Sequence, residues 1–406
     1  MTLRVAIIGA GIGGLANAAF LAKAGHDVVV LERSPTLEPV GAGLLLQPTG
    51  RAVLDRLGVG DRIASLGAPV DRLQGVTTSG RTVLSLAYTD LRPGLQGTGV
   101  HRGLLHSSLL EAATTAGARI RSGIGVDEVS DRSGVATLRM SDGQASGPYD
   151  LVVIASGARS TLRRFAGDVR RAQRYPWGAL WFVANNPPQA FERVLGQVYQ
   201  DTTTMLGFLP TGRLTTDGPE TISVFWSLRT KDWAGPEAFE LDAWKDRVRR
   251  LRPEAAPMFD QVERADQLIF APYYDVHLAQ RPGRVVAIGD AAHATSPQLG
   301  QGANLALLDA ACLADKVANS AEIPHAVRRF ARARKSPTRY YRVVSRWLTP
   351  WFQSDARWLT GPRDAFMGPL CAFPPTRRQM LLALAGVKRS WVSSRLADAT
   401  GETKLH

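Results

Sequence analysis

Three glycines near the start of the chain, Gly9, Gly11 and Gly14, have the spacing of a turn that binds a phosphate group. They follow an apolar stretch from Val5 to Ile8 and precede a helical pattern. Gly9 allows a tight turn, Gly11 lets the backbone approach a pyrophosphate, and Gly14 lets the helix pack closely on the strand. The N-terminus of that helix supplies N–H groups without partners and the positive end of its dipole. The pattern therefore predicts a dinucleotide site.

A glutamate at the end of the next apolar strand supports this interpretation. The carboxylate of Glu32 can accept hydrogen bonds from both hydroxyls of an adenosine ribose, and Gly13 and Arg33 complete the predicted contacts. The alternative is a signal peptide or a membrane span, because Val5 to Ala22 is uncharged and follows Arg4. Four glycines within six positions, and a charged turn that leads into another strand, favour the nucleotide site.

A second glycine-rich segment, from Gly283 to Val317, again has the order strand, turn and helix. Asp290 follows the strand Val285 to Ile288, and its carboxylate can accept a hydroxyl group of a sugar alcohol. The turn leads into a helix from about Ala303, whose free N–H groups can face an anionic or electron-rich ring edge. A plain alternative is a buried strand and helix joined by a long turn. The predicted contacts are Asp290, Pro297, Gly300, Gly302, Ala303 and Asn304.

Together the two segments resemble those of FAD-dependent monooxygenases of the para-hydroxybenzoate hydroxylase and salicylate hydroxylase type. The resemblance covers nearly the whole chain. It includes Thr98 to Ala113, which resembles the family segment whose arginine, here Arg102, contacts the flavin nucleotide. It implies that Gly9 to Glu32 holds the adenosine end of FAD, and that Asp290 to Asn304 holds the end where oxygen chemistry occurs.

The reaction implied by the resemblance begins with reduction of FAD by NADPH or NADH. The reduced cofactor then activates O2, one oxygen atom passes to an aromatic or polycyclic substrate, and the other leaves as water. One residue departs from the family pattern. Asp150 to Arg164 resembles an internal strand and turn usually written Ala-Asp-Gly, but Ser156 replaces the aspartate, which removes a negative charge near where the family handles its cofactors. This leaves open an FAD-dependent oxidase or dehydrogenase that needs no NAD(P)H. A catalytically silent flavin-binding protein is a second alternative, against which the flavin-loop residues Pro297, Gly300 and Gly302 argue.

The expected fold class is α/β, with a Rossmann-like FAD-binding domain, an inserted mixed-sheet substrate domain and a helical C-terminal tail. The FAD-binding domain comprises residues 1–75, 97–165 and 272–345, the substrate domain 76–96 and 166–271, and the tail 346–406. Four stretches rich in aromatic and β-branched residues predict strands of the substrate domain. They are Trp177 to Ala184, Arg193 to Gln200, Met205 to Pro210 and Thr221 to Arg229.

Aromatic side chains in the middle of these strands suit an apolar or aromatic substrate. Period-two alternation places Phe225 and Trp226 on opposite faces of the last strand, and either face can be the one that meets the flavin. Ordinary core packing is the alternative for each of the aromatic residues. The pocket candidates are Trp181, Tyr199, Phe208 and Trp226.

A carboxylated substrate would need a buried arginine. The candidates Arg193, Arg213 and Arg229 lie near strand ends or turns, where solvation is expected, and this favours a neutral, larger substrate.

The catalytic residues are left unassigned, since no histidine or carboxylate stands out as a base. No HxxxH, HExxH or clustered Cys/His pattern indicates a metal site, and the absence of a WxWxIP segment disfavours a halogenase.

The composition agrees with a large enzyme, because 406 residues that are 45% hydrophobic can bury a sizeable core. The chain has only two cysteines, Cys312 and Cys371, so a disulfide framework is not expected. We expect a cytoplasmic location. The net charge of +13 would attract anionic molecules, but no nucleic-acid module accompanies it.

The tail from Tyr340 to Lys388 combines aromatic residues, Leu and Arg in a helical pattern. It is expected to cover the domain junction, with membrane contact as the alternative, and the oligomeric state is left open.

Overall fold

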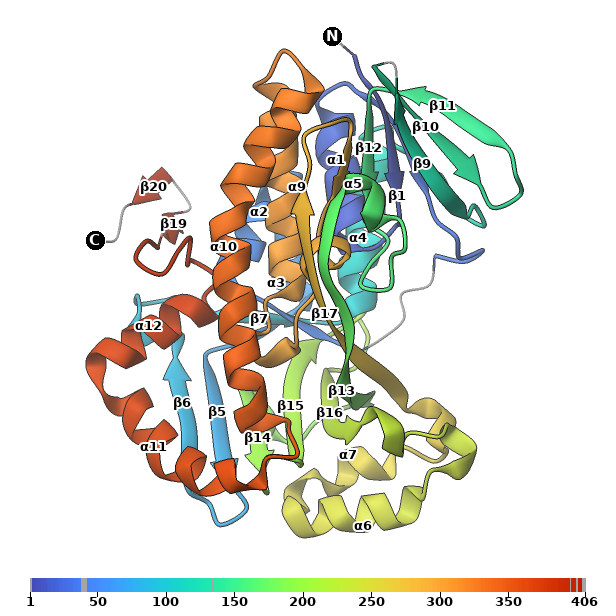
Figure 1. Ribbon diagram of the computed structural model, residues 1–406. Helices are drawn as coiled ribbons and strands as arrows, with labels where there is room; N and C mark the ends of the chain where they lie inside the picture. The colour runs from blue at the N-terminus through green and yellow to red at the C-terminus, as the bar shows by residue number, and fades with distance from the viewer. Residues whose placement is uncertain (1, 38–41, 133, 395, 399–400, 404–406) are drawn as a thin grey trace.

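The computed structural model describes residues 2–37, 42–132, 134–394, 396–398 and 401–403. One half of the molecule is built on a five-stranded parallel sheet in the order β18-β12-β1-β2-β8 (Figure 1). Its three central strands, β12, β1 and β2, consist almost entirely of apolar residues, as expected for a parallel sheet that is covered on both faces. The strands are β1 (Arg4–Ile8), β2 (Asp27–Leu31), β8 (Arg119–Arg121), β12 (Leu151–Ile154) and β18 (Val285–Ala287).

Alternate side chains of this sheet belong to two different cores. Val5 and Ile7 pack with one layer of helices, whereas Ala6 and Ile8 pack with a small antiparallel sheet on the other face. The helical layer contains α1 (Ile12–Lys23), α4 (Arg102–Thr115), α9 (Gly302–Ala318) and the start of α10 (Ile323–Phe352). The antiparallel sheet contains β9 (Val126–Arg132), β10 (Val135–Met140) and β11 (Ala145–Tyr149).

The two glycine-rich segments lie side by side in this half, although they are far apart in the sequence. Helix α9 packs against α1, and the buried side chain of Asn17 donates a hydrogen bond of 3.0 Å to the carbonyl oxygen of Ala310. Strands β1 and β18 run parallel on either side of β12, so the turns after both strands open at the same edge of the sheet. That edge is where α/β folds of this kind bind ligands.

The other half contains a seven-stranded mixed sheet in the order β17-β13-β16-β15-β14-β5-β6. All neighbours are antiparallel except β14 and β5. The strands are β5 (Arg72–Thr77), β6 (Thr82–Ala87), β13 (Gly167–Asn185), β14 (Val194–Tyr199), β15 (Met205–Gly212), β16 (Thr221–Arg229) and β17 (Ile269–Gln280). Two helices, α6 (Leu241–Leu251) and α7 (Ala256–Asp260), cover one face of this sheet.

The four strands expected in this half are present, and one of them is much longer than expected. Strand β13 begins at Gly167 rather than at Trp177, because its first part pairs with β17 in a ribbon that joins the two halves of the molecule. The expected domain boundary between residues 75 and 76 falls inside β5. The α/β class with a parallel sheet and a mixed sheet is confirmed.

The C-terminal region is helical, as expected, and lies along both halves of the molecule (Figure 1). Helix α10 runs the length of the molecule, and α11 (Thr360–Ala372) packs on β6 and is followed by α12 (Pro374–Leu384). Among the helices that the structure describes, none has both the length and the apolar character needed to cross a bilayer. The remaining elements are α2 (Pro48–Leu57), α3 (Gly60–Leu66), α5 (Arg163–Ala166), α8 (Asp290–His293), β3 (Leu44–Leu46), β4 (Ala68–Val70), β7 (Gly97–Val100), β19 (Leu396–Asp398) and β20 (Gly401–Thr403).

Candidate active site

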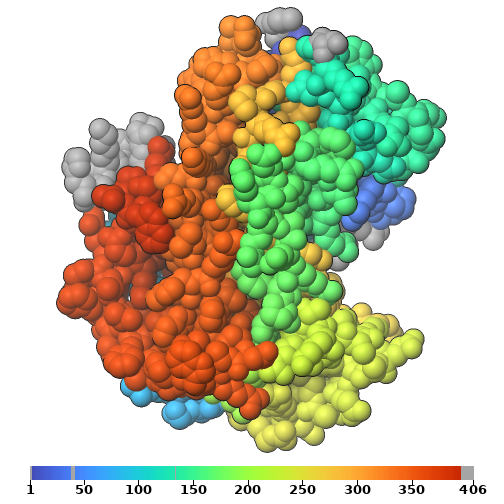
Figure 2. Space-filling model, viewed as in Figure 1, coloured from blue at the N-terminus to red at the C-terminus, as the bar shows by residue number. Residues whose placement is uncertain are grey.

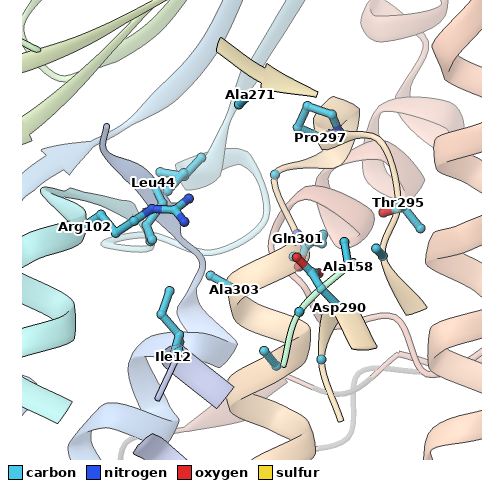
Figure 3. Close-up of a pocket in the computed structure, with 18 of the residues that line it drawn as sticks. Ile12, Leu44, Arg102, Ala158, Ala271, Asp290, Thr295, Pro297, Gln301 and Ala303 are labelled. Carbon is cyan, nitrogen blue, oxygen red and sulfur yellow. The ribbon is translucent and has the colours of Figure 1, made fainter. Parts of the chain in front are cut away.

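A cavity of about 690 Å³ lies between the edge of the parallel sheet and the seven-stranded sheet. Both glycine-rich segments line it, and so do α4, β3 and the middle of the seven-stranded sheet. Figure 3 shows Arg102 and Leu44 on one side of this cavity, with Asp290, Thr295 and Pro297 on the other. The sites predicted from the two distant segments are therefore parts of one site.

The glycines of the first turn have different structural roles. Gly9 has a φ of +108°, and a Cβ atom there would lie 2.6 Å from the carbonyl oxygen of Ala155. A Cβ atom on Gly14 would lie only 2.0 Å from the carbonyl oxygen of Gly9. Neither residue lines the cavity, so both serve close packing, whereas Gly11 and Gly13 do line it. Around Gly11 no atom lies within 4 Å of such a Cβ position, which leaves the backbone open to a ligand.

Glu32 is held in place by the backbone of the turn that it faces. Its Oε2 atom accepts a hydrogen bond of 2.8 Å from the N–H of Ala10, and its Oε1 atom accepts one of 2.9 Å from the N–H of Ser34. Each carboxylate oxygen keeps a further lone pair, and the residue lines the cavity. Its neighbour Arg33 is exposed and does not line the cavity.

Arg102 is the first residue of α4 and lines the cavity from the side opposite Asp290. Its accessible surface faces a space surrounded by protein, so the guanidinium is partly desolvated even though the residue is exposed. Burial lowers the pKa of Arg102 from its ordinary value, and the negative charge of Asp290 acts in the opposite direction. The helix is capped by His101, whose Nδ1 atom accepts a hydrogen bond of 3.1 Å from the N–H of Gly103. The site thus places a fixed cation and a carboxylate across the same cavity.

Asp290 is positioned by a buried carboxylate on another helix. Asp309, on α9, is 1% exposed and accepts hydrogen bonds from the N–H of Gly289 at 2.8 Å and from Nε2 of His293 at 2.6 Å. Arg334, on α10, donates to the other oxygen of the same carboxylate at 2.5 Å. His293 therefore has a structural role in fixing α8, the short helix that begins with Asp290.

The loop before α9 is tied to two other parts of the chain. The side chain of Asn304 is buried: it accepts a hydrogen bond from the N–H of Gln47 and donates to the carbonyl oxygen of Leu45. The side chain of Gln301 donates to the carbonyl oxygens of Ala383 and Leu384 at the end of α12. Asn304 thus fixes the loop without lining the cavity, while the predicted contacts Pro297, Gly300, Gly302 and Ala303 all line it.

The part of the cavity beside the seven-stranded sheet is apolar. Trp181 and Phe225 lie on neighbouring strands with ring centroids 4.9 Å apart, and both line the cavity. Phe225 covers Gly207 on the next strand, where a Cβ atom would lie 1.9 Å from the phenyl ring. The absence of a side chain at Gly207 therefore leaves room for the aromatic wall. Other residues of this wall are Leu73, Leu195, Gln197, Met205, Leu209, Ala271, Pro272 and Tyr273.

Three of the four aromatic pocket candidates require correction. Phe208 and Trp226 point to the opposite face of the sheet, where they pack with α6 and α7. Tyr199 is on the correct face but is fully buried behind the lining, and its hydroxyl donates to Gln197. Trp181 alone of the four lines the cavity. The alternation along each strand was clear from the sequence, but the inward face is decided by the helices α6 and α7, which lie far along the chain.

The three arginines considered for a carboxylated substrate all form ion pairs away from the cavity. Arg193 pairs with Asp71 at 2.7 Å, Arg213 pairs with Glu220 at 2.8 Å, and Arg229 pairs with Asp355. Among the described residues that line the cavity, the charged or imidazole side chains are Glu32, Arg102, His106 and Asp290, all at the nucleotide end.

Ser156 lies just behind the cavity wall formed by Ala155, Gly157 and Ala158. Its hydroxyl is 2.7 Å from the hydroxyl of Ser160. The guanidinium of Arg163 donates to the carbonyl oxygens of the same turn. The serine therefore forms a neutral pair inside this turn, without the negative charge that an aspartate would add.

The donor set fits FAD. The glycine backbone at Gly11, the carboxylate of Glu32, the cation of Arg102 and the N-terminus of α9 suit a long cofactor that carries phosphates and a ring system. When bound, FAD supplies the redox and oxygen-activating chemistry, and the protein supplies position and exclusion of water. In the described part of the chain, no group of three or more His, Cys, Asp or Glu residues could hold a metal ion.

Comparison with known proteins decides the family. A family model described as an FAD binding domain matches residues 2–322 of this chain. The chain belongs to the FAD-dependent class A monooxygenases. These are oxidoreductases of the salicylate hydroxylase type, which use NAD(P)H and O2.

Curated relatives of this monooxygenase act on aromatic rings according to their names. The 3-amino-4-hydroxybenzoate 2-monooxygenase of Streptomyces cremeus is 33% identical in an alignment of 337 positions that covers 77% of each chain. The 6-hydroxynicotinate 3-monooxygenase of Bordetella bronchiseptica is 29% identical over 332 residues, covering 76% of this chain and 81% of the relative.

Solved structures show the same fold at lower identity. HpxO of Klebsiella pneumoniae, solved with FAD and uric acid, superposes with a TM-score of 0.77 at 21% identity, over 94% of this chain and 97% of the other. The tetrameric form of 2-methyl-3-hydroxypyridine-5-carboxylic acid oxygenase gives a TM-score of 0.74 at 22% identity, over 86% and 93% of the chains. The monooxygenase fold is therefore shared over nearly the whole length.

Several lining residues of the monooxygenase were not anticipated from the sequence. Leu44 and Leu45 enter the cavity from β3, which pairs with β7 in a small separate sheet. His106 lines the nucleotide end, and its Nε2 atom is 2.9 Å from the carbonyl oxygen of Ala10. Its position one helical turn after Arg102 was the available signal, because residues four apart share a helix face.

Proposed function

We propose that this FAD-dependent monooxygenase inserts one oxygen atom into a neutral aromatic or polycyclic molecule, which binds between Trp181, Phe225 and the loop that precedes α9. The observation that carries the proposal is the apolar wall beside the seven-stranded sheet. No charged side chain lies on this wall within the described residues, and a carboxylated substrate placed there would lose its hydration without gaining a cation.

A polar group on the wall supports a hydrogen-bonding substrate. The side-chain oxygen of Gln197 accepts a hydrogen bond from Tyr199, so its NH2 group is left as a donor to a ligand in the cavity. Such a donor suits a carbonyl, a phenol or a phenolate oxygen on the substrate ring. The aromatic rings of Trp181 and Phe225 offer stacking surfaces to the ring itself.

We propose the following roles at the cofactor end. Glu32 accepts the adenosine ribose hydroxyls, the backbone near Gly11 approaches the pyrophosphate, and Arg102 offsets its negative charge. Asp290 accepts a hydroxyl of the ribityl chain. Support comes from the fact that all four residues line one continuous cavity, with Arg102 and Asp290 on opposite sides of it.

The location and the domain division are part of the same proposal. Both cysteines are free thiols, which is typical of a reducing cytoplasm. The FAD-binding domain comprises the parallel sheet with its covering layers, and the substrate domain comprises the seven-stranded sheet with α6 and α7.

The test is to incubate the FAD-loaded protein with NADPH or NADH, O2 and a matched panel of neutral phenols and their carboxylated analogues. We expect products that gain one oxygen atom, coupled to consumption of the nucleotide, from the neutral members. The variant Leu195→Arg, which adds a cation to the apolar wall, should increase binding of the carboxylated members. Preferential turnover of carboxylated members by the wild type would contradict the substrate class, and loss of two hydrogens without nucleotide use would indicate an oxidase.

A further inference from the structure

The positive charge of this chain is concentrated in its C-terminal helices. Residues 323–394 contain 14 of the 49 basic residues but only 2 of the 36 acidic ones, so they carry nearly all of the net charge of +13. The preceding part of the chain is close to neutral. Figure 2 shows that α10 and the segments after it, coloured orange to red, form one continuous face of the molecule. We call α10, α11, α12 and residues 385–394 the C-terminal layer.

One side of α10 is a basic stripe. Its members are exposed and follow each other at intervals of three or four residues, the spacing that places side chains on one helix face. Within the described residues, Arg332, Lys335 and Arg339 form no ion pair. The same stripe continues with exposed Val343 and Trp347. The basic members are Arg328, Arg332, Lys335 and Arg339.

Large apolar side chains are exposed on the same layer. Of the eleven large hydrophobic residues that are exposed in the described part of the chain, eight lie between Val343 and Val392. Phe366 and Leu370 share the outer side of α11, and exposed Phe373 directly follows this helix, while Met367 and Cys371 on its inner side are buried. The most exposed aromatic residues are Trp358 at 74%, Phe366 at 65%, and Trp347 and Phe373 at 58% each. Exposed aromatic residues gathered in this way mark an interaction surface.

We propose that the C-terminal layer docks this enzyme peripherally on an anionic lipid surface. Basic side chains next to Trp and Phe are the combination that binds a lipid interface, because the cations contact anionic headgroups and the aromatic rings enter the headgroup region. The alternative occupant, a second copy of this chain, is disfavoured by charge. A symmetric contact through this layer would bring the exposed basic stripes of two copies together.

The experiment is co-sedimentation of the full-length, FAD-loaded protein with vesicles of phosphatidylcholine alone or of phosphatidylcholine mixed with phosphatidylglycerol. We expect binding to the anionic vesicles only, and weaker binding as salt is added. The triple variant Trp358→Ser, Phe366→Ser and Phe373→Ser should weaken that binding by at least about tenfold. The triple variant Arg332→Gln, Lys335→Gln and Arg339→Gln should weaken it by a similar factor. Both sets change exposed residues, so the FAD spectrum and the melting temperature report whether the fold is kept.

Matched controls change residues of the same kind outside the layer. Leu214→Ser removes another exposed apolar side chain, and Lys23→Gln with Lys231→Gln and Arg250→Gln removes the same number of exposed charges. These controls should bind vesicles as the wild type does. Absence of binding to anionic vesicles, or equal losses in the controls and the layer variants, would overturn the proposal. It would also be overturned by a wild-type dimer that the aromatic variant converts to a monomer, or by binding to duplex DNA in place of vesicles.

Discussion

The Oδ2 atom of Asp309 lies 2.6 Å from the Nε2 atom of His293, in a pair that is almost completely buried. The same oxygen accepts a hydrogen bond from the N–H of Gly289, and Arg334 donates to the other oxygen. One carboxylate thus joins α8, α9 and α10 behind the cavity wall that carries Asp290. The position of Asp290 at the cofactor end therefore depends on the ion pairs of Asp309 with His293 and Arg334, none of which lines the cavity.

This network makes stability depend on pH. Burial alone would raise the pKa of Asp309, but the charges of His293 and Arg334, and the hydrogen bonds from His293 and Gly289, hold it well below its usual range. A carboxyl group with a depressed pKa stabilises the fold above its unfolded-state pKa of about 3.9, and that stabilisation is lost as the pH falls below this value. Asp309→Asn should therefore lower the free energy of unfolding by about 3 kcal/mol at neutral pH, since it leaves Arg334 without its charged partner. It should also flatten the dependence of that free energy on pH below about pH 4.

The measurement is urea unfolding at a series of pH values, with Asp315→Asn as the control. Asp315 lies on the same helix, but its ion pair with Arg56 at 2.7 Å is about half exposed on both sides. Exposed pairs of this kind contribute less than about 1 kcal/mol, so the control should stay close to the wild type. An equal decrease in the free energy of unfolding of the two variants would show that the buried network contributes no more to stability than the exposed ion pair does.

Asp290 allows a test of cofactor binding that leaves the fold intact. Its side chain is exposed and lines the cavity, so removing it creates no cavity in the core. Asp290→Ala should raise the Kd for FAD at least about tenfold, as expected for loss of a hydrogen bond to a charged group, and leave the melting temperature of the apoprotein nearly unchanged. Cys312→Ala, half-buried on α9 and outside the cavity, is the control and should keep the wild-type Kd. An unchanged Kd in Asp290→Ala would remove this residue from the cofactor site.

The cofactor end could be predicted from the sequence because each glycine segment is local: strand, turn and helix follow each other along the chain, and the residue types at the turn report the ligand. The substrate wall could not be predicted in the same way. Phe225 and Trp226 are adjacent on β16, and only the packing of Trp244 and Phe259 against one face determines that Trp226 is buried there. The sequence pattern predicts Trp226 on the cavity wall, whereas the structure places its neighbour Phe225 there. Successive side chains of a strand point to opposite faces, so an error of one residue exchanges the buried face and the cavity face. Gly207, which makes room for Phe225, had no signal of its own in the sequence.

That pair of neighbours gives a prediction for substrate binding. Phe225→Leu should raise KM several-fold, because the ring that packs beside Trp181 on the cavity wall is lost, and it should lower the free energy of unfolding by about 1 kcal/mol, because Phe225 is 7% exposed. Trp226→Leu should lower the free energy of unfolding by about 2 kcal/mol and leave KM unchanged, since this side chain is 4% exposed in the core under α6. Steady-state kinetics and urea unfolding of both variants provide the measurement. A larger rise of KM in Trp226→Leu would place the substrate on the other face of the sheet.

The C-terminal helices should also affect the cofactor, through Gly386. This residue follows α12 with a φ of +78°, and a Cβ atom there would lie 2.4 Å from Oγ1 of Thr49 and 3.2 Å from Oε1 of Gln301. Gln301 binds the end of α12 and lines the cavity, so a shift at Gly386 is transmitted to the loop before α9. Gly386→Ala should lower the free energy of unfolding by about 1–2 kcal/mol through strain at positive φ, and it should speed the release of FAD. Gly361→Ala is the matched control: it lies in α11 with no atom within 4 Å of the new Cβ, and should leave stability unchanged or raise it by up to about 1 kcal/mol. Stopped-flow release of FAD separates the two variants, and equal release rates would show that α12 does not hold the loop.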